Sequence, residues 1–283
     1  MHPIYAHAEQ RAQLWALLEA TWPGLPAGFD LADWYGWPID AVSTPFVARV
    51  DGRIVSHVGV LDLPVCLGGE RRVIAGLHGV CTLPEHRLQG HCRRAMEQAM
   101  AHVSARYGAA KLTTDKPAVY EPFGFRVVPQ SRFVLRRRGS AGQGSRPVLE
   151  EDLPWMRRVL AQRAPQSLHF TTRDPGWLVG IDGVLHGDGL GLFHRIDALD
   201  ALVAWDTREG SLQLLQVVAR ELPSLEALLA ASPWPYDDVV LWFAPDLLAP
   251  HAEPIPYPAE DQLMVWGDWP DLPPFAVPPL EAH

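Results

Sequence analysis

The most informative stretch of this sequence is Val80-Cys81-Thr82-Leu83-Pro84-Glu85-His86-Arg87-Leu88-Gln89-Gly90-His91-Cys92-Arg93-Arg94. Residues 74–82 are rich in β-forming side chains, and the apolar residues after the stretch recur at helical spacing until Gly108. The sequence therefore predicts a strand, a loop and a helix, in this order. The first N–H groups of a helix have no backbone partner, and the helix dipole adds partial positive charge there. A loop that ends in Gly90 at a helix start is thus typical of a phosphate site, to which Arg87 and Arg93 or Arg94 would add donors.

The surrounding residues predict a layered α/β fold. Residues 10–22 carry apolar side chains at helical spacing, and Pro23-Gly24 ends this helix. Residues 46–50 and 53–60 are β-rich runs around Asp51-Gly52, which is a strong hairpin signal. Residues 111–114 and 126–135 predict two further strands. This order of elements predicts a mixed sheet flanked by helices.

A glycine- and serine-rich segment divides the chain. Residues 139–146 predict a linker between a first domain of residues 1–138 and a second domain of residues 147–283. In the second half, residues 146–160 predict a strand and a helix, Gly183 and Gly187-Asp188-Gly189 predict a pair of hairpins, and residues 212–218 predict a strand. No glycine loop follows that last strand, and Glu221 places negative charge there. We therefore expect only the first domain to bind a phosphate-bearing ligand.

The loop motif resembles a known family. Arg87-Leu88-Gln89-Gly90-His91-Cys92 is similar to motif A of the GNAT superfamily of N-acetyltransferases, Arg/Gln-x-x-Gly-x-Gly/Ala, with Cys92 in place of the usual small residue. In that family the motif binds the pyrophosphate of acetyl-CoA. The resemblance also implies that the main chain of the preceding strand pairs with the pantetheine arm and that an N–H near Val80 stabilises the oxyanion. The implied cofactor-binding residues are Val80, Cys81, Thr82, Arg87, Leu88, Gln89, Gly90, His91, Cys92 and Arg93.

A wider resemblance concerns the enhanced intracellular survival (Eis) type of these enzymes. It rests on Ala75-Gly76-Leu77, Pro84, His86-Arg87, Gly90, Arg94-Ala95-Met96, Val119-Tyr120 and Phe123-Gly124-Phe125. The resemblance implies tandem GNAT-like domains, the second of them degenerate. Family members usually carry a third, sterol-carrier-like domain, for which 283 residues leave no room.

Three side chains are candidates for work on the substrate, and each has an alternative. Tyr120 lies just before Phe123-Gly124-Phe125 and matches the general acid of the family, although a lone tyrosine is often a packing residue. His78 is either a catalytic base near the cleft or an ordinary strand histidine. Trp34, together with Tyr35 and Trp37, either lines an acceptor pocket or belongs to the core.

Charge and composition limit the function classes. The net charge of −9 argues against binding to nucleic acid, and three cysteines without paired spacing indicate neither disulfides nor a metal site. No apolar run reaches the roughly 18 residues of a membrane span, and no signal peptide is evident, so we expect a cytoplasmic protein without membrane contact. Residues 1–138 carry a net charge of +4 and residues 139–283 one of −13. This division favours a cationic acceptor.

These observations and the resemblance lead to one expected function. We expect an N-acetyltransferase that moves acetyl from acetyl-CoA to the amine of a cationic small molecule, by direct attack and without a metal. A polyamine, an aminoglycoside-like sugar or a lysine-rich peptide would each fit the charge. The alternative is a CoA-binding or interaction protein that keeps the fold without turnover. The resemblance makes a homo-oligomer possible.

Overall fold

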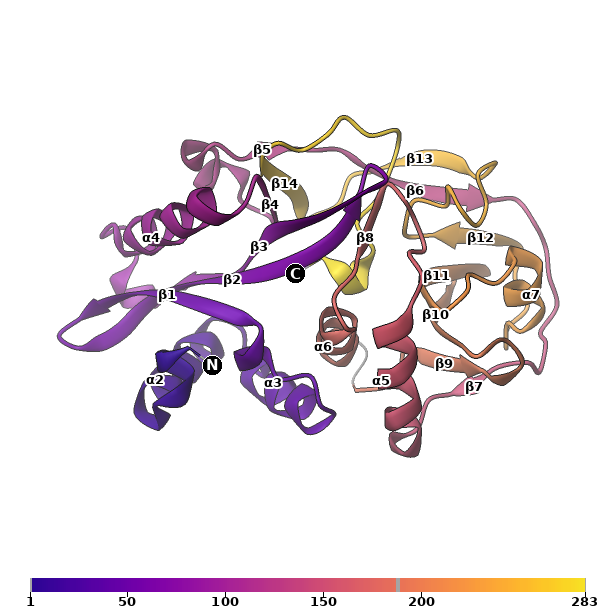
Figure 1. Ribbon diagram of the computed structural model, residues 1–283, viewed down its shortest axis with the longest axis horizontal. Helices are drawn as coiled ribbons and strands as arrows, with labels where there is room; N and C mark the ends of the chain where they lie inside the picture. Colours follow the sequence, from indigo (N-terminus) through magenta and orange to yellow (C-terminus); the bar gives the residue numbers. More distant parts are fainter. Residues whose placement is uncertain (1, 187–188, 283) are drawn as a thin grey trace.

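The computed structural model describes residues 2–186 and 189–282, which form two seven-stranded mixed sheets side by side (Figure 1). The α-helices are α1 (Pro3–Ala6), α2 (Ala8–Thr21), α3 (Leu25–Trp34), α4 (His91–Arg106), α5 (Leu153–Gln162), α6 (Trp177–His186) and α7 (Leu225–Ala230). The strands of the first half are β1 (Ser43–Val50), β2 (Arg53–Leu67), β3 (Glu70–Thr82), β4 (Ala109–Thr114), β5 (Arg126–Val127) and β6 (Gln130–Leu135). The second half holds β7 (Arg146–Pro147), β8 (Phe170–Thr172), β9 (Phe193–Ile196), β10 (Ala201–Arg208), β11 (Ser211–Val218), β12 (Asp238–Leu241), β13 (Glu253–Tyr257) and β14 (Gln262–Gly267). Two mixed sheets with helices confirm the predicted fold class.

The first sheet has the strand order β1-β2-β3-β4-β14-β5, and β8 pairs with the far end of β2. Helix α4 covers one face, where Met96 and Ala99 pack with Val58 and Val60 in one apolar cluster. Helices α2 and α3 cover the opposite face and belong to the larger cluster, which continues into the second half. The expected helix at residues 10–22, the hairpin around Asp51-Gly52 and the strand, loop and helix around Gly90 are all present.

Two irregularities open this sheet at its centre. Strands β3 and β4 pair in parallel at Ala75 with Ala110 and at Gly76 with Lys111, and then diverge. Farther along β3, Gly79 has φ +57°, and the register with β2 shifts so that one residue of β2 lies opposite two of β3. This is a β-bulge, which redirects the backbone of Gly79 and Val80. The divergence and the bulge together leave part of the β3 main chain facing a gap.

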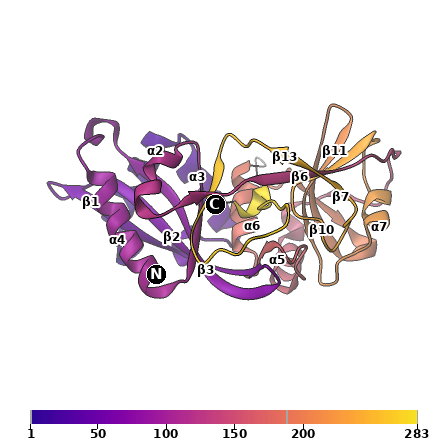
Figure 2. The same cartoon turned by 90° about the horizontal axis from the view of Figure 1, so that it is seen from above.

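The second sheet has the order β13-β6-β12-β11-β10-β9-β7, and it exchanges strands with the first. Strand β6 comes from the first half of the chain, whereas β14 returns to pair with β4. The strand expected at 126–135 is therefore two strands, because Pro129 interrupts it and cannot donate a ladder hydrogen bond. The segment at 139–146 divides the sequence into two halves, but it is not the boundary between the two sheets. Strand β6 precedes it and belongs to the second sheet, whereas β14 follows it and belongs to the first. Figure 2, seen from above, shows the two halves side by side, with β6 running toward the second sheet.

The hairpin expected around Gly183 is wrong, because this residue lies in the middle of α6. The two glycines of this helix, Gly180 and Gly183, allow aromatic rings to pack directly against its backbone. A Cβ atom on Gly183 would lie 2.2 Å from the ring of Phe193, and one on Gly180 would lie 2.3 Å from the ring of Trp37. The second expected hairpin includes residues 187 and 188, which lie outside the described residues.

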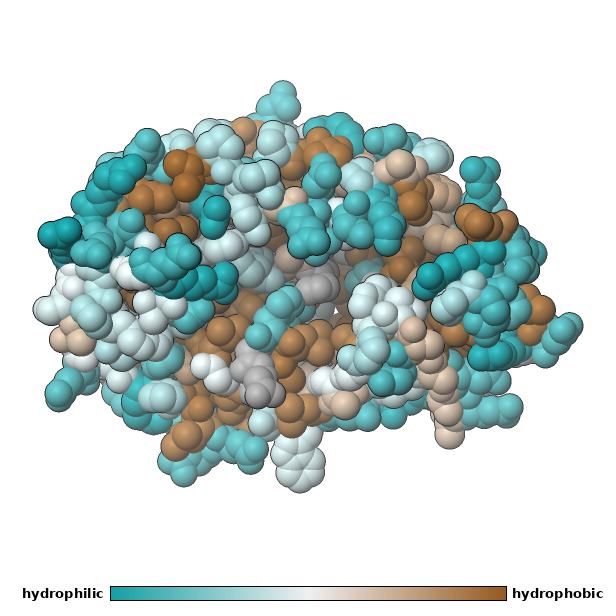
Figure 3. Space-filling view, turned by 180° about the vertical axis from the view of Figure 1, so that it is seen from behind, coloured by the Kyte–Doolittle hydropathy of each residue, from teal (hydrophilic) through white to brown (hydrophobic). Residues whose placement is uncertain are grey.

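Apolar residues are unevenly distributed over the surface. Seen from behind, apolar residues gather in the lower middle of the molecule, whereas the two ends are largely hydrophilic (Figure 3). In the part of the chain that the structure describes, no helix is both long and apolar enough to cross a membrane.

Candidate active site

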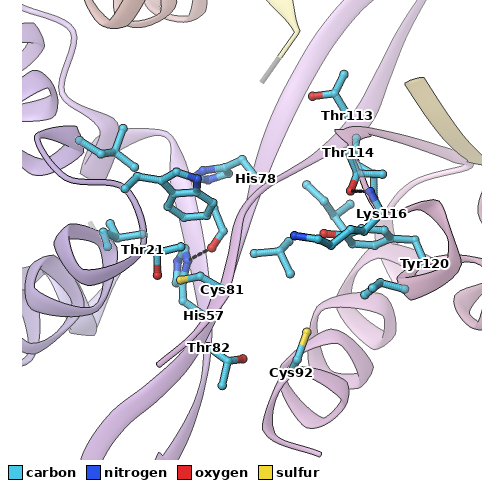
Figure 4. Close-up of a pocket in the computed structure, with 18 of the residues that line it drawn as sticks. Thr21, His57, His78, Cys81, Thr82, Cys92, Thr113, Thr114, Lys116 and Tyr120 are labelled. Carbon is cyan, nitrogen blue, oxygen red and sulfur yellow. Dashed lines mark hydrogen bonds between the residues drawn. The ribbon is translucent and has the colours of Figure 1, made fainter. Parts of the chain in front are cut away.

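A cavity of about 1420 Å³ lies where β3 and β4 diverge. Its lining comes from β2, β3, the start of α4, the segment from the end of β4 to Phe123, helices α1, α2, α3 and α6, and residues 260–261. The cavity therefore reaches both the α4 side of the first sheet and the side covered by α2 and α3. Figure 4 shows His57, His78 and Cys81 on one side of this cavity and Tyr120 on the other.

The start of α4 forms one end of the cavity. Gly90 precedes the helix with φ +78°, and a Cβ atom built there would meet nothing within 4 Å. No side chain caps the helix, so the first N–H groups of a 16-residue helix stay open. Such an end attracts anions.

Most residues predicted to bind the cofactor line this cavity. They are Val80, Cys81, Thr82, Arg87, Leu88, Gly90, His91, Cys92 and Arg93. Gln89 is absent from the lining, and its side-chain amide donates to the carbonyl oxygen of Glu85 at 3.0 Å. Arg87 is exposed, and its Nε donates to the carbonyl oxygen of Thr82 at 3.2 Å. The Cys92 side chain packs against the apolar cluster under α4.

Tyr120 lies across the cavity from His57 and Cys81. It is 7% exposed and packs edge-on against Phe125. Burial raises the pKa of Tyr120 to about 12. The phenol therefore keeps its proton at neutral pH and can donate it.

Two histidines lie on the α2 side of the sheet. The Nε2 atom of His78 lies 2.8 Å from the hydroxyl of Ser43, and its ring rests on Gly59, where a Cβ atom would come within 2.1 Å. His57, which the sequence did not single out, is fully buried and lines the cavity. Its Nδ1 lies 2.7 Å from the carbonyl oxygen of Gly79, and because a carbonyl only accepts, Nδ1 must carry the proton. Burial lowers the pKa of His57 to about 4, so the ring is neutral at pH 7.

The pairing of β2 with β3 is the signal that could have revealed His57. The Asp51-Gly52 turn fixes the register of the first hairpin, and the next hairpin places His57 opposite Cys81. A histidine opposite the predicted cofactor strand was therefore a candidate. The bulge at Gly79, whose carbonyl oxygen lies 2.7 Å from His57 Nδ1, could not be predicted from the sequence.

Trp34 lies outside the cavity lining and outside the core, so its contact with a substrate stays a prediction. Its side chain is 78% exposed. At about 100° per helical residue, five residues turn Trp34 well away from Phe29, which faces inward from the same helix. Aromatic residues line the cavity all the same, namely Tyr5, Trp15, Trp22 and Phe29. Among the described residues, no group of three or more His, Cys, Asp or Glu side chains could hold a metal ion.

Part of the chain is similar to a known protein family. Residues 25–128 match the family model of an acetyltransferase (GNAT) domain. No curated protein sequence matches the chain significantly. The matched residues include β3 and the loop before α4, which form part of the cavity lining.

Solved structures share the fold at low identity. A GCN5-related N-acetyltransferase from Anabaena variabilis is 16% identical with a TM-score of 0.59, and the alignment covers 92% of this chain and 70% of that one. A probable N-acyltransferase from Enterococcus faecalis is 14% identical with a TM-score of 0.57, covering 91% and 70%. Eis1 from Mycobacterium abscessus is 15% identical with a TM-score of 0.53, covering 78% of this chain and 63% of that one. The chain therefore shares the fold of these structures, and its two mixed sheets are consistent with tandem GNAT-like domains.

Proposed function

We propose that this protein is an N-acetyltransferase that moves acetyl from acetyl-CoA to the primary amine of a cationic small molecule. One observation carries the proposal. A single cavity joins the uncapped start of α4, behind Gly90, to the buried and protonated hydroxyl of Tyr120. The first feature suits a pyrophosphate, and the second suits the release of a thiolate.

The residues present fit acetyl-CoA. The open N–H groups at the start of α4 would hold the pyrophosphate, and Arg87 and Arg93 lie beside them with charged donors. The diverging strand β3 offers the main chain of Val80 and Thr82 to the pantetheine arm, which would pair like an added strand. The cavity continues past this point to the opposite side of the sheet, where an acceptor would enter.

The reaction requires one bond to form and one to break. The neutral amine nitrogen attacks the thioester carbonyl, so that a C–N bond forms and the C–S bond breaks. Tyr120 donates its proton to the departing sulfur, and a base takes the proton that the amine loses. A backbone N–H at the Gly79 bulge, near Val80, stabilises the oxyanion. His78 is the proposed base, since it lines the cavity on the acceptor side.

Release of free thiol from acetyl-CoA tests this proposal. We expect thiol release that depends on both an added primary amine and the protein, together with an acetylated product of matching mass. Binding of acetyl-CoA without thiol release, for any amine in a broad panel, would instead support the alternative of a CoA-binding protein without turnover.

A further inference from the structure

The acceptor side of the cavity carries an extended apolar surface beside its histidines. Tyr5, Trp15 and Phe29 line it from α1, α2 and α3. The ring centroids of Tyr5 and Trp15 lie 6.1 Å apart, and so do those of Trp15 and Phe29. These three rings therefore form one continuous aromatic surface that faces the cavity.

Helix α6 continues this surface from the second half of the chain. Leu178 and Ile181 are each 2% exposed, and they line the cavity together with Leu185. We call these six residues the apolar wall: Tyr5, Trp15, Phe29, Leu178, Ile181 and Leu185. The wall comes from both halves, because α3 packs against α6.

The acidic groups of the described lining do not form a site for several cations. Asp182 on α6 is fully buried, and it interacts electrostatically with the buried Lys111. Asp115 forms an ion pair with Lys116 at 3.2 Å, on the Tyr120 side. Glu260 and Asp261 directly precede β14, whose first residue pairs with Thr114, so they also lie near Tyr120. The −13 charge of the second half is thus mostly outside the cavity.

We propose that the acceptor is a monoamine with a large apolar body, such as an arylalkylamine. This inference rests on the proposed function. An apolar body gains free energy when it leaves water for the apolar wall. A polyamine or an aminoglycoside would lose the hydration of several charges there, and the described lining offers few carboxylates to replace it. The wall therefore selects for one amine group carried by apolar surface.

A matched panel of amines tests the inference by two independent measurements. The panel consists of 2-phenylethylamine, ethylamine, spermine and kanamycin, each measured for kcat/KM and for binding to the CoA-loaded protein by calorimetry. We expect 2-phenylethylamine to exceed ethylamine by at least about tenfold in both, as burial of a phenyl group predicts. It should also exceed spermine and kanamycin.

Two tryptophan variants localise the effect. Trp22 follows α2, which carries Trp15 of the apolar wall; it lines the cavity and is 40% exposed, so Trp22→Ala should fold. It should weaken binding of 2-phenylethylamine about fivefold or more and leave ethylamine unchanged. Trp34→Ala is the matched control, since Trp34 is outside the lining, and should change neither.

The outcomes separate the inference from the proposed function. Tighter binding and faster turnover of spermine or kanamycin would overturn the apolar acceptor while acetyl transfer remained. Absence of thiol release with every amine would overturn the proposed function, and the calorimetric order of the four amines would still decide whether the cavity prefers an apolar body.

Discussion

The hydroxyl of Tyr120 is the group on which the proposed chemistry depends most directly. Burial keeps the phenol protonated, with a pKa of about 12, and phenylalanine would preserve its packing against Phe125. We expect Tyr120→Phe to lower kcat about 10²-fold or more, which is the usual contribution of a general acid. Acetyl-CoA affinity, measured by calorimetry, should stay nearly unchanged. A fall in kcat of less than about threefold would make Tyr120 a packing residue.

His57 is expected to act through the backbone rather than on the substrate. Its Nδ1–H donates to the carbonyl oxygen of Gly79 and so fixes the bulge that orients the N–H groups near Val80. An asparagine amide can make the same bond, whereas leucine cannot. We expect His57→Leu to lower kcat about tenfold, as loss of one buried hydrogen bond predicts, and His57→Asn to restore most of it.

The pH profile provides a second measurement on His57. With a pKa of about 4, the ring does not titrate between pH 6 and 9. The profile of kcat/KM in that range should therefore be the same for wild type and His57→Asn. A limb near neutral pH that disappears in His57→Asn would show that His57 itself takes up the proton.

At the scale of elements, the start of α4 can be tested against a turn with equal backbone strain. Gly90 and Gly52 have φ of +78° and +80°, and neither has a neighbour within 4 Å of a built Cβ atom. Glutamate should cost similar stability at both positions, because both conformations disfavour a side chain. Only Gly90→Glu also places charge and bulk before the open N–H groups.

We therefore expect Gly90→Glu to weaken acetyl-CoA binding by about 3 kcal/mol, the scale of losing hydrogen bonds to a charged group, and Gly52→Glu to leave it unchanged. Calorimetric titration measures both, and thermal unfolding checks that each variant folds. Equal affinities in the two folded variants would refute the phosphate site.

Elements with local signals could be predicted from the sequence, and elements that depend on distant contacts could not. The Asp51-Gly52 turn and the Gly90 loop carry their own conformational requirements, so both were predicted correctly. Gly183 looked like a turn residue, yet it is glycine because the ring of Phe193 occupies the space of a side chain. The return of β14 to β4 pairs residues about 150 positions apart, and no periodicity encodes such a pairing. The apolar wall was missed for the same reason, since α6 reaches it from the other half.

For the whole molecule, the two halves should differ in cofactor binding. Helix α7 follows β11 as α4 follows β3, but it has only six residues, and the Ser224 hydroxyl accepts from the N–H of Ala227 at its start. This cap uses a donor that α4 leaves open. We expect one acetyl-CoA per chain by calorimetry, and a clear stoichiometry of two would show that the second half binds as well.

The contact between the two sheets should respond to pH through Glu281. Its carboxylate accepts from the N–H of Thr172 on β8 at 2.7 Å and from the side chain of Gln216 on β11 at 2.8 Å, and so links the first sheet to the second. Burial raises the pKa of Glu281 to about 7, above the 4.5 of an ordinary glutamate. Between these values the folded state binds more protons than the unfolded state, so stability falls as pH rises through this window.

A pKa shift from 4.5 to about 7 corresponds to a change of about 3 kcal/mol in the free energy of unfolding across this pH window. Glu281→Gln keeps the size of the side chain and an acceptor for Thr172 but cannot titrate. We therefore expect the Tm of the wild type, relative to that of Glu281→Gln, to decrease from pH 5 to pH 8. Thermal unfolding at several pH values measures the difference. Titrating groups that do not interact with Glu281 cancel, whereas the buried Lys111, whose pKa the Glu281 charge raises, contributes to the difference. A difference in Tm that stays constant over this range would mean that Glu281 titrates at the same pH in the folded and unfolded chains.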